Sequence, residues 1–144
     1  MPADPIAARP SLASVTALLE SAGLPTEDLT AHHCEHFFYL GSPDAPSGLV
    51  GLELFGDVAL LRSLVVNSHH QRTGAGSALL RHAEQAASEA GVREIYLLTT
   101  TAESFFEKRG CRRATRDAAP PAIRATREFA GICPASSAFM TRTL

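Results

Sequence analysis

Hydrophobic side chains recur along the chain at two spacings, and the alternation between them predicts a protein of mixed helices and strands. The 3.6-residue spacing of amphipathic helices predicts helices over residues 12–22, 25–29, 77–90, 102–109 and from 120 to about 130. Strands are predicted where short apolar runs lie between turn residues: residues 34–40, 49–55, 58–66, 94–99, 111–115 and 137–142. No repeat or linker interrupts this order, so one α/β domain over residues 1–144 is expected.

Two of these strands flank the helix over residues 77–90. If the strands over 60–66 and 94–99 are neighbours in one sheet, the helical crossover makes them parallel and right-handed. Ligands of such units bind at the carboxyl ends of the parallel strands, where the helix also begins. A binding cleft is therefore predicted at that edge of the sheet.

The loop that enters this helix reads Gln-x-x-Gly-x-Gly over residues 71–76. The first N–H groups of a helix have no partner within it, and the helix dipole makes that end attractive to anions. Gly74 and Gly76 let the backbone approach a bulky ligand closely. The spacing fits neither the dinucleotide fingerprint nor the Gly-x-x-x-x-Gly-Lys phosphate loop. The sequence therefore predicts an anion site of another kind.

Two motifs together resemble the GNAT acetyltransferases. The loop is similar to their pyrophosphate loop, and residues 99–111 are similar to their second signature, Asn-x-x-Ala-x-x-Phe-Tyr-x-Lys-x-Gly-Phe. The resemblance implies a twisted, mixed sheet of six to seven strands flanked by four to five helices and splayed open between two parallel central strands. It also implies acetyl-CoA as co-substrate, with no metal required.

The resemblance further implies where acetyl-CoA binds. The pantetheine arm would pair with the backbone of residues 64–66, and the N–H groups of residues 71–76 would hold the pyrophosphate, with the side chain of Arg72 adding charge. For Arg72 and for His70 the alternative is a solvated loop. The residues expected to bind the cofactor are Leu64, Val65, Val66, Gln71, Arg72, Thr73, Gly74, Ala75, Gly76, Ser77, Thr99 and Phe106.

The usual proton-handling residues of the family are missing. Phe106 stands where the signature has its tyrosine acid, and Leu61 stands where many members carry a glutamate base. Ser63 shares strand parity with Leu61, so it is expected to face the cleft, where it could order a water. Tyr96, on the neighbouring strand, is the nearest other phenol. Both residues are candidates for catalysis, and a structural role is the alternative for each.

Several stretches resemble the bacterial GNAT proteins of arsenic resistance, above all the Phe105-Phe106 pair and residues 133–137. This implies acetylation of the primary amine of a small molecule, with an amino-acid-like arsenical or phosphinate toxin as a candidate. Arg124 and Arg127 lie three apart on a predicted helix and could clamp an oxyanion, or form an exposed face. The expected substrate-binding residues are Arg62, Arg124, Arg127 and Phe129.

Composition and net charge limit the partners and the location that are expected for the protein. A formal net charge of −2 over 144 residues gives no electrostatic basis for binding nucleic acid, and no apolar run is long enough to span a membrane. The N-terminus lacks the pattern of a signal peptide, so a cytoplasmic location is expected. The sequence is compatible with a homodimer. It is also compatible with two rival functions: an acyl-CoA sensor without catalysis, and an arsenite-binding protein that uses Cys34, Cys111 and Cys133.

Overall fold

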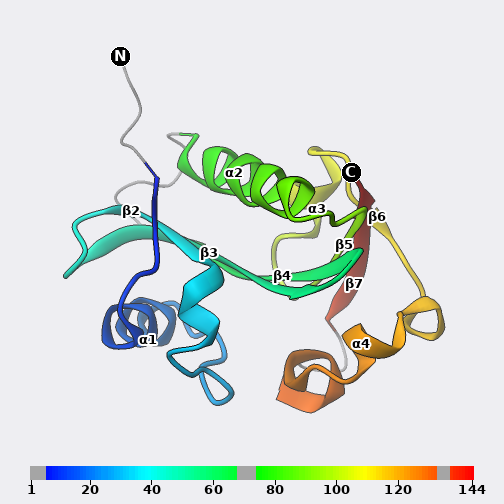
Figure 1. The fold of residues 1–144 in the computed structure, drawn as a ribbon, viewed down its shortest axis with the longest axis horizontal. Coiled ribbons are helices and arrows are strands. Elements are labelled where there is room, and N and C mark those ends of the chain that lie inside the picture. The colour runs from blue at the N-terminus through cyan, green and yellow to red at the C-terminus, as the bar shows by residue number, and fades with distance from the viewer. Residues whose placement is uncertain (1–5, 68–73, 133–136) are drawn as a thin grey trace.

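One mixed sheet organises the computed structural model, which describes residues 6–67, 74–132 and 137–144. Within these residues seven strands lie in the order β1-β2-β3-β4-β5-β7-β6, and the pair β4–β5 is the parallel one (Figure 1). The strands are β1 (Ala7–Ala8), β2 (Phe37–Gly41), β3 (Pro46–Phe55), β4 (Val58–Val66), β5 (Glu94–Thr99), β6 (Arg112–Arg113) and β7 (Ala138–Thr143). The mixed α/β fold predicted from the sequence is confirmed.

Helices cover both faces of the sheet (Figure 1). The long helix α2 (Ala75–Glu89) lies on one face and buries Leu79, Leu80, Ala83 and Ala87, which recur at helical spacing. On the opposite face α1 (Leu12–Ser21) buries Val15 and Leu19 against Phe37 and Leu49. The remaining helical segments are α3 (Glu103–Glu107), α4 (Pro121–Arg124), two 3-10 turns (His33–His36, Arg116–Ala118) and a π-helical turn (Glu128–Ile132).

The two parallel strands pair over a short distance only. Val58, Ala59 and Leu60 of β4 pair with Glu94, Ile95 and Tyr96 of β5. Beyond them β4 stays paired with β3, and β5 stays paired with β7. Among the described residues, the facing backbone edges of residues 61–65 and 97–99 therefore have no strand partner. This is the splay that the family resemblance implies.

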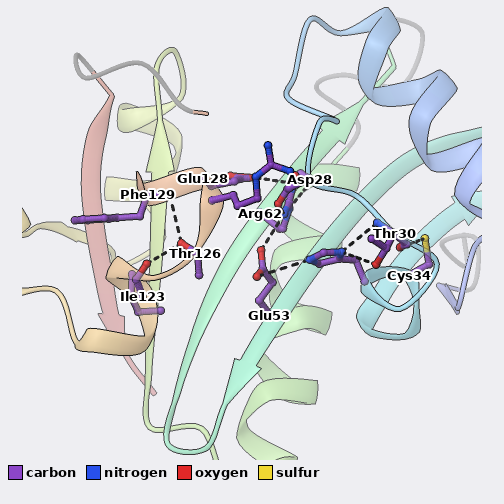
Figure 2. A network of polar contacts seen from close by, with 12 residues as sticks. Asp28, Thr30, Cys34, Glu53, Arg62, Ile123, Thr126, Glu128 and Phe129 are labelled. Carbon is purple, nitrogen blue, oxygen red and sulfur yellow. Dashed lines mark hydrogen bonds and ion pairs between the residues drawn. The ribbon is translucent and has the colours of Figure 1, made fainter. Parts of the chain in front are cut away.

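One predicted helix does not form, and another is shorter than predicted. Residues 25–29 form a turn and irregular chain, and Asp28 in their midst is buried against Arg62. The helix expected from 120 to about 130 ends at Arg124, after which Thr126 competes for backbone groups (Figure 2). Its hydroxyl donates to the carbonyl of Ile123 and accepts from the N–H of Phe129. Such local side-chain bonds interrupt helices.

Strand boundaries differ from the prediction at several places. The strand expected from residue 34 begins at Phe37, after the 3-10 turn, and the strand expected over 111–115 shrinks to Arg112–Arg113. Residues 46–48, expected in a loop, begin β3, where proline is tolerated as the first residue of a strand. The short edge strand Ala7–Ala8 was not predicted. In the part of the chain that the structure describes, none of the helices has the length and hydropathy of a membrane span.

Candidate active site

A cleft of about 510 Å³ occupies the splay between β4 and β5. Its volume is typical of sites for small molecules. Backbone and side chains from far apart in the chain line it: Gly23, Leu24, Pro25, Thr26, Glu27, Leu61, Arg62, Ser63, Leu64, Leu97, Leu98, Thr99, Thr100, Thr101, Ala102, Phe106, Glu128 and Ser137. The predicted position of the cleft, at the carboxyl ends of the parallel strands, is confirmed.

A β-bulge shapes the β4 wall of this cleft. Arg62 pairs with Gly51 and Val65 pairs with Leu49, so two residues of β4, Ser63 and Leu64, stand opposite one residue of β3. Ser63 has a φ of 59°, a left-handed conformation that costs energy in a residue other than glycine. Bulges of this kind displace backbone groups from the strand ladder and recur next to functional sites. The bulge thus directs backbone groups of β4 away from regular pairing at the cleft.

The start of α2 lies after the end of β4. Gly74 caps the helix with a φ of 87°, and its carbonyl accepts the first helical hydrogen bond, from Ala78. The N–H groups of residues 75–77 precede that bond and have no acceptor within the helix. A side chain at Gly76 would meet the ring of Phe105 at 3.3 Å, so Gly76 allows α2 to pack closely on α3.

A buried ion cluster closes the cleft on the side of the loop after α1. The guanidinium of Arg62 contacts three carboxylates: it binds both oxygens of Asp28, lies 2.8 Å from Glu53 Oε2, and lies 2.9 Å from Glu128 Oε1. Its Nε also donates to the hydroxyl of Ser63, at 3.2 Å. Figure 2 shows Asp28 and Glu128 reaching Arg62 from opposite sides, while Glu53 lies on the neighbouring strand β3.

Charge pairing keeps Asp28 and Arg62 of this cluster ionised. Burial alone would raise the pKa of Asp28, but the hydrogen bond and the charge of Arg62 outweigh it and the pKa is lowered. Burial would likewise lower the pKa of Arg62, and its carboxylate partners raise it instead. Arg62 and Asp28 therefore stay charged at neutral pH.

A model of the acetyltransferase (GNAT) family matches residues 11–111, about two thirds of the sequence. The chain belongs to this family. The family is named for acetyltransferases, and similar structures have been solved with coenzyme A.

Individual relatives of this GNAT domain include enzymes that act on amino acids. An amino-acid acetyltransferase of Ralstonia nicotianae is 40% identical over 63 residues, which are 44% of this chain and 14% of that protein. The N-acetylglutamate synthase of Neisseria gonorrhoeae, solved with coenzyme A and N-acetyl-glutamate, superposes with a TM-score of 0.81 at 25% identity. That match covers 97% of this chain and 35% of the synthase, so the GNAT domain spans about a third of the length of this relative.

A third structure matches over nearly its whole length. Rv2747 of Mycobacterium tuberculosis, solved with CoA, has a TM-score of 0.73 and 15% identity, and the match covers 97% of this chain and 99% of that one. At this identity the likeness concerns the fold. The splayed sheet of the GNAT domain is thus a shared framework.

The structure places some of the expected cofactor residues at the cleft and others beside it. Leu64, Thr99 and Phe106 line the cleft. Val65 and Val66 continue β4 beyond the bulge, and residues 74–77 form the start of α2. The hydroxyl of Ser77 accepts a hydrogen bond from Arg109 at 2.8 Å. His70, Gln71, Arg72 and Thr73 lie outside the described residues, so their roles stay predictions.

The two catalytic candidates are placed differently. Ser63 lines the cleft as expected, although the bulge rather than simple strand parity puts it there. Tyr96 is buried at 7% exposure, stacks on Phe139, and is absent from the cleft lining. Burial, followed by the charge of Glu94, raises the pKa of Tyr96. The phenol therefore packs within the core among the described residues.

The predicted anion clamps do not form as expected. Arg62 reaches the cleft wall, but Asp28, Glu53 and Glu128 already hold its guanidinium. Such a group has little capacity left for a substrate anion.

Arg124 and Arg127 do not form a pair on one helix, because α4 ends at Arg124. Arg124 donates to the carbonyls of Ala119 and Asp117, Arg127 donates to the carbonyl of Glu27, and neither lines the cleft. Phe129 packs on Phe139 at 5.3 Å between ring centroids, also away from the cleft lining.

Four polar residues of the site were not predicted from the sequence: Asp28, Glu53, Glu128 and Ser137. Asp28 and Glu128 lie 34 and 66 positions from Arg62, so no local spacing joins them to it. The signal that could have found the three carboxylates is the need to balance the charge of Arg62. Arg62 is buried in a strand in which Ser63 is the only other polar residue, and a buried guanidinium requires carboxylate partners from elsewhere in the chain.

Neither of the two described cysteines takes part in a shared thiol site. Cys34 is buried with α1 in one core cluster, and Cys111 is buried with α2 in another. Cys133 lies outside the described residues. The described thiols are therefore separate small core residues.

One group of described residues has the spacing of a metal site, yet it suits a metal poorly. Ligand atoms of Asp28, His33 and Glu53 lie within 4.8 Å of one another. The guanidinium of Arg62 already contacts both carboxylates. The Nδ1 atom of His33 accepts the N–H of Thr30, which places the ring proton of a neutral imidazole on Nε2, the atom nearest Glu53. The cluster is thus built around its own cation.

Proposed function

We propose that the GNAT domain transfers acetyl from acetyl-CoA to the primary amine of a small, amino-acid-like molecule. The observation that carries this proposal is the cleft between the diverging ends of β4 and β5, bordered by the bulge at Ser63. A sheet that opens in this way offers backbone hydrogen-bonding groups on both walls and space for an extended ligand between them.

Two parts of acetyl-CoA, the pantetheine arm and the pyrophosphate, each fit a part of this geometry. The pantetheine arm, which carries amide groups, would pair with the edge of residues 64–66 as an added strand does. The pyrophosphate would bind at the start of α2, where N–H groups and the helix dipole favour anions. Gln71, Arg72 and Thr73 would complete that site, on the strength of the sequence motif.

The reaction we propose is direct attack on the thioester. The amine nitrogen of the acceptor forms a bond to the acetyl carbonyl carbon, and the bond from that carbon to sulfur breaks. The acceptor starts as an ammonium and releases one proton to become the neutral amine that attacks; after attack the nitrogen loses a second proton, which passes to the sulfur, and the sulfur leaves as the thiol of coenzyme A. Holding the two reactants together supplies a large part of the rate in such reactions.

The acceptor class rests on the relatives. The Ralstonia nicotianae and Neisseria gonorrhoeae proteins are named for amino-acid acetylation and N-acetylglutamate synthesis. An amino-acid-like arsenical or phosphinate toxin carries the same amine and carboxylate, so detoxification is a narrower form of this proposal. It rests on the sequence resemblance at Phe105, Phe106 and residues 133–137 alone.

The test is acetyl transfer with defined acceptors. The protein is incubated with acetyl-CoA and separately with L-glutamate, other L-amino acids and phosphinothricin, and both thiol release and the N-acetylated product are measured. We expect one group of amines to give thiol and product in equal amounts. CoA binding without transfer to any amine would instead indicate an acyl-CoA sensor. Lack of CoA binding would contradict both functions.

A further inference from the structure

Two polar side chains from the C-terminal part of the chain reach the cleft. Glu128 comes from the π-helical turn after α4, and Ser137 directly precedes β7. Both are more than nine-tenths buried, with exposures of 6% and 7%. Neither belongs to the sequence motifs of the donor site, so they are available for a role toward the acceptor.

The hydroxyl of Ser137 has no hydrogen-bond partner in the part of the chain that the structure describes. A buried polar group without a partner is costly, and such groups are rare in native proteins. Because Ser137 also lines the cleft, a ligand bound there would supply the missing partner. The hydroxyl can accept or donate, so an amine N–H is a suitable partner.

Glu128 gives the same end of the cleft a negative charge. Asp28, Glu53 and Glu128 all contact the one guanidinium of Arg62, so in this group of described side chains the carboxylates outnumber the guanidinium by three to one. Of the three carboxylates, Glu128 is the one that lines the cleft. A carboxylate accepts several hydrogen bonds, so contact with Arg62 is compatible with binding a second cation. The excess charge favours an ammonium group over an anion.

We infer that Glu128 and Ser137 form the amine-binding end of the cleft, with Glu128 accepting the proton that the acceptor must lose before it attacks. This inference rests on the proposed function. The ammonium donates one N–H to the Glu128 carboxylate and one to the Ser137 hydroxyl. Transfer of a proton to Glu128, and from there to solvent, leaves a neutral amine whose lone pair forms the new carbon–nitrogen bond. Arg62 acts as a positioning residue, because it fixes the carboxylate.

Two substitutions test the inference, with an acceptor that the wild-type protein acetylates. Glu128→Gln keeps the shape and an oxygen for Arg62 but removes the charge. It is expected to lower kcat/KM for the amine by roughly 100-fold, the scale of general-base catalysis, while the KM for acetyl-CoA changes by less than about twofold. Ser137→Ala is expected to raise the KM for the amine on the order of tenfold, as for loss of a hydrogen bond to a charged group.

Stability separates a ligand-binding role from a structural one. Because the Ser137 hydroxyl has no partner in the described residues, Ser137→Ala is expected to leave the Tm unchanged or higher. The matched control for Glu128 is Glu84→Gln, which removes a carboxylate that pairs with Arg142 at 3.2 Å, has a side chain 12% exposed and is absent from the cleft lining. It should leave the kinetics toward the amine near the wild-type values. Ser88→Ala, on an exposed part of α2, is the control for Ser137.

The outcomes are distinct. Loss of amine kinetics in Glu128→Gln and Ser137→Ala, but not in their controls, supports the inference. Equal kinetic losses in Glu128→Gln and in Glu53→Gln, which removes a carboxylate of Arg62 outside the cleft lining, would show that Glu128 only holds Arg62, and would overturn the inference. Unchanged amine kinetics in Ser137→Ala would remove Ser137 from the site. A wild-type protein that acetylates none of the amines would overturn the proposed function, and the inference with it.

Discussion

Replacing Arg62 with methionine should destabilise the protein strongly, because the guanidinium contacts three carboxylates that are buried or nearly so. Asp28, Glu53 and Glu128 are 4%, 14% and 7% exposed at their side chains. Methionine fills a similar volume but removes the positive charge that these carboxylates share. Removing one partner of a buried ion pair costs about 3–5 kcal/mol. For a domain of this size that corresponds to a fall in Tm of roughly 10–15 °C.

The size of this loss should depend on pH. In the folded wild-type protein the pKa of Asp28 is lowered, so its contribution to stability is present above the unfolded pKa and is lost as the pH falls through the folded one. Without Arg62, burial dominates and raises the pKa of Asp28, so a proton relieves the repulsion already in weakly acidic solution. The stability difference between wild type and variant should therefore be largest near neutral pH and shrink toward about pH 4.5.

The assay is urea unfolding of both proteins across that pH range. Arg113→Met is the matched control, because Arg113 pairs with Glu103 at the surface and its side chain is 69% exposed. Exposed pairs contribute little, so this variant should unfold near the wild-type midpoint at every pH. A loss below about 1 kcal/mol in Arg62→Met, or a loss that does not shrink in acid, would refute the account of the cluster.

Three further predictions concern individual residues. Gly74→Ala should weaken CoA binding several-fold in calorimetric titration, because alanine is strained at a φ of 87° and Gly74 caps the start of α2. Gly91→Ala is the control: its φ of 91° gives the same strain beyond the other end of α2, so CoA binding should not change. Tyr96→Phe should keep kcat within about threefold of wild type, since the phenol is buried against Phe139; a loss of 100-fold or more would restore it as a catalytic acid. The thiols of Cys34 and Cys111 should be labelled by maleimide only on unfolding, because burial raises the pKa of each; rapid native labelling, followed by mass spectrometry, would contradict this.

Local features of the fold were predictable from the sequence, and features that depend on distant residues were not. The order of β4, α2 and β5 follows from hydrophobic spacing and from the glycines at both ends of α2, and the parallel pairing follows from that order. The bulge at Ser63 leaves no mark in the apolar run of β4. Likewise, Thr126 ends the predicted helix by taking backbone partners, a choice that helical spacing alone does not reveal.

The same distinction explains the site. The proposed donor site depends on a loop and a helix start that are contiguous in sequence, so a motif can describe it. The proposed acceptor site depends on charge pairing among Asp28, Arg62 and Glu128, which only the folded chain brings together. The arginine clamp was predicted because sequence shows that a cation is present, but does not show that the protein itself neutralises it.

The central claim is that the splay between β4 and β5 holds the donor. Hydrogen exchange of the backbone amides, with and without saturating CoA, tests it most directly, because the claim names the amides concerned. We predict slower exchange in residues 63–66 of β4, residues 97–99 of β5 and the first turn of α2 when CoA is bound. CoA binding that leaves these three segments unchanged, and slows exchange elsewhere on the molecule, would contradict the account.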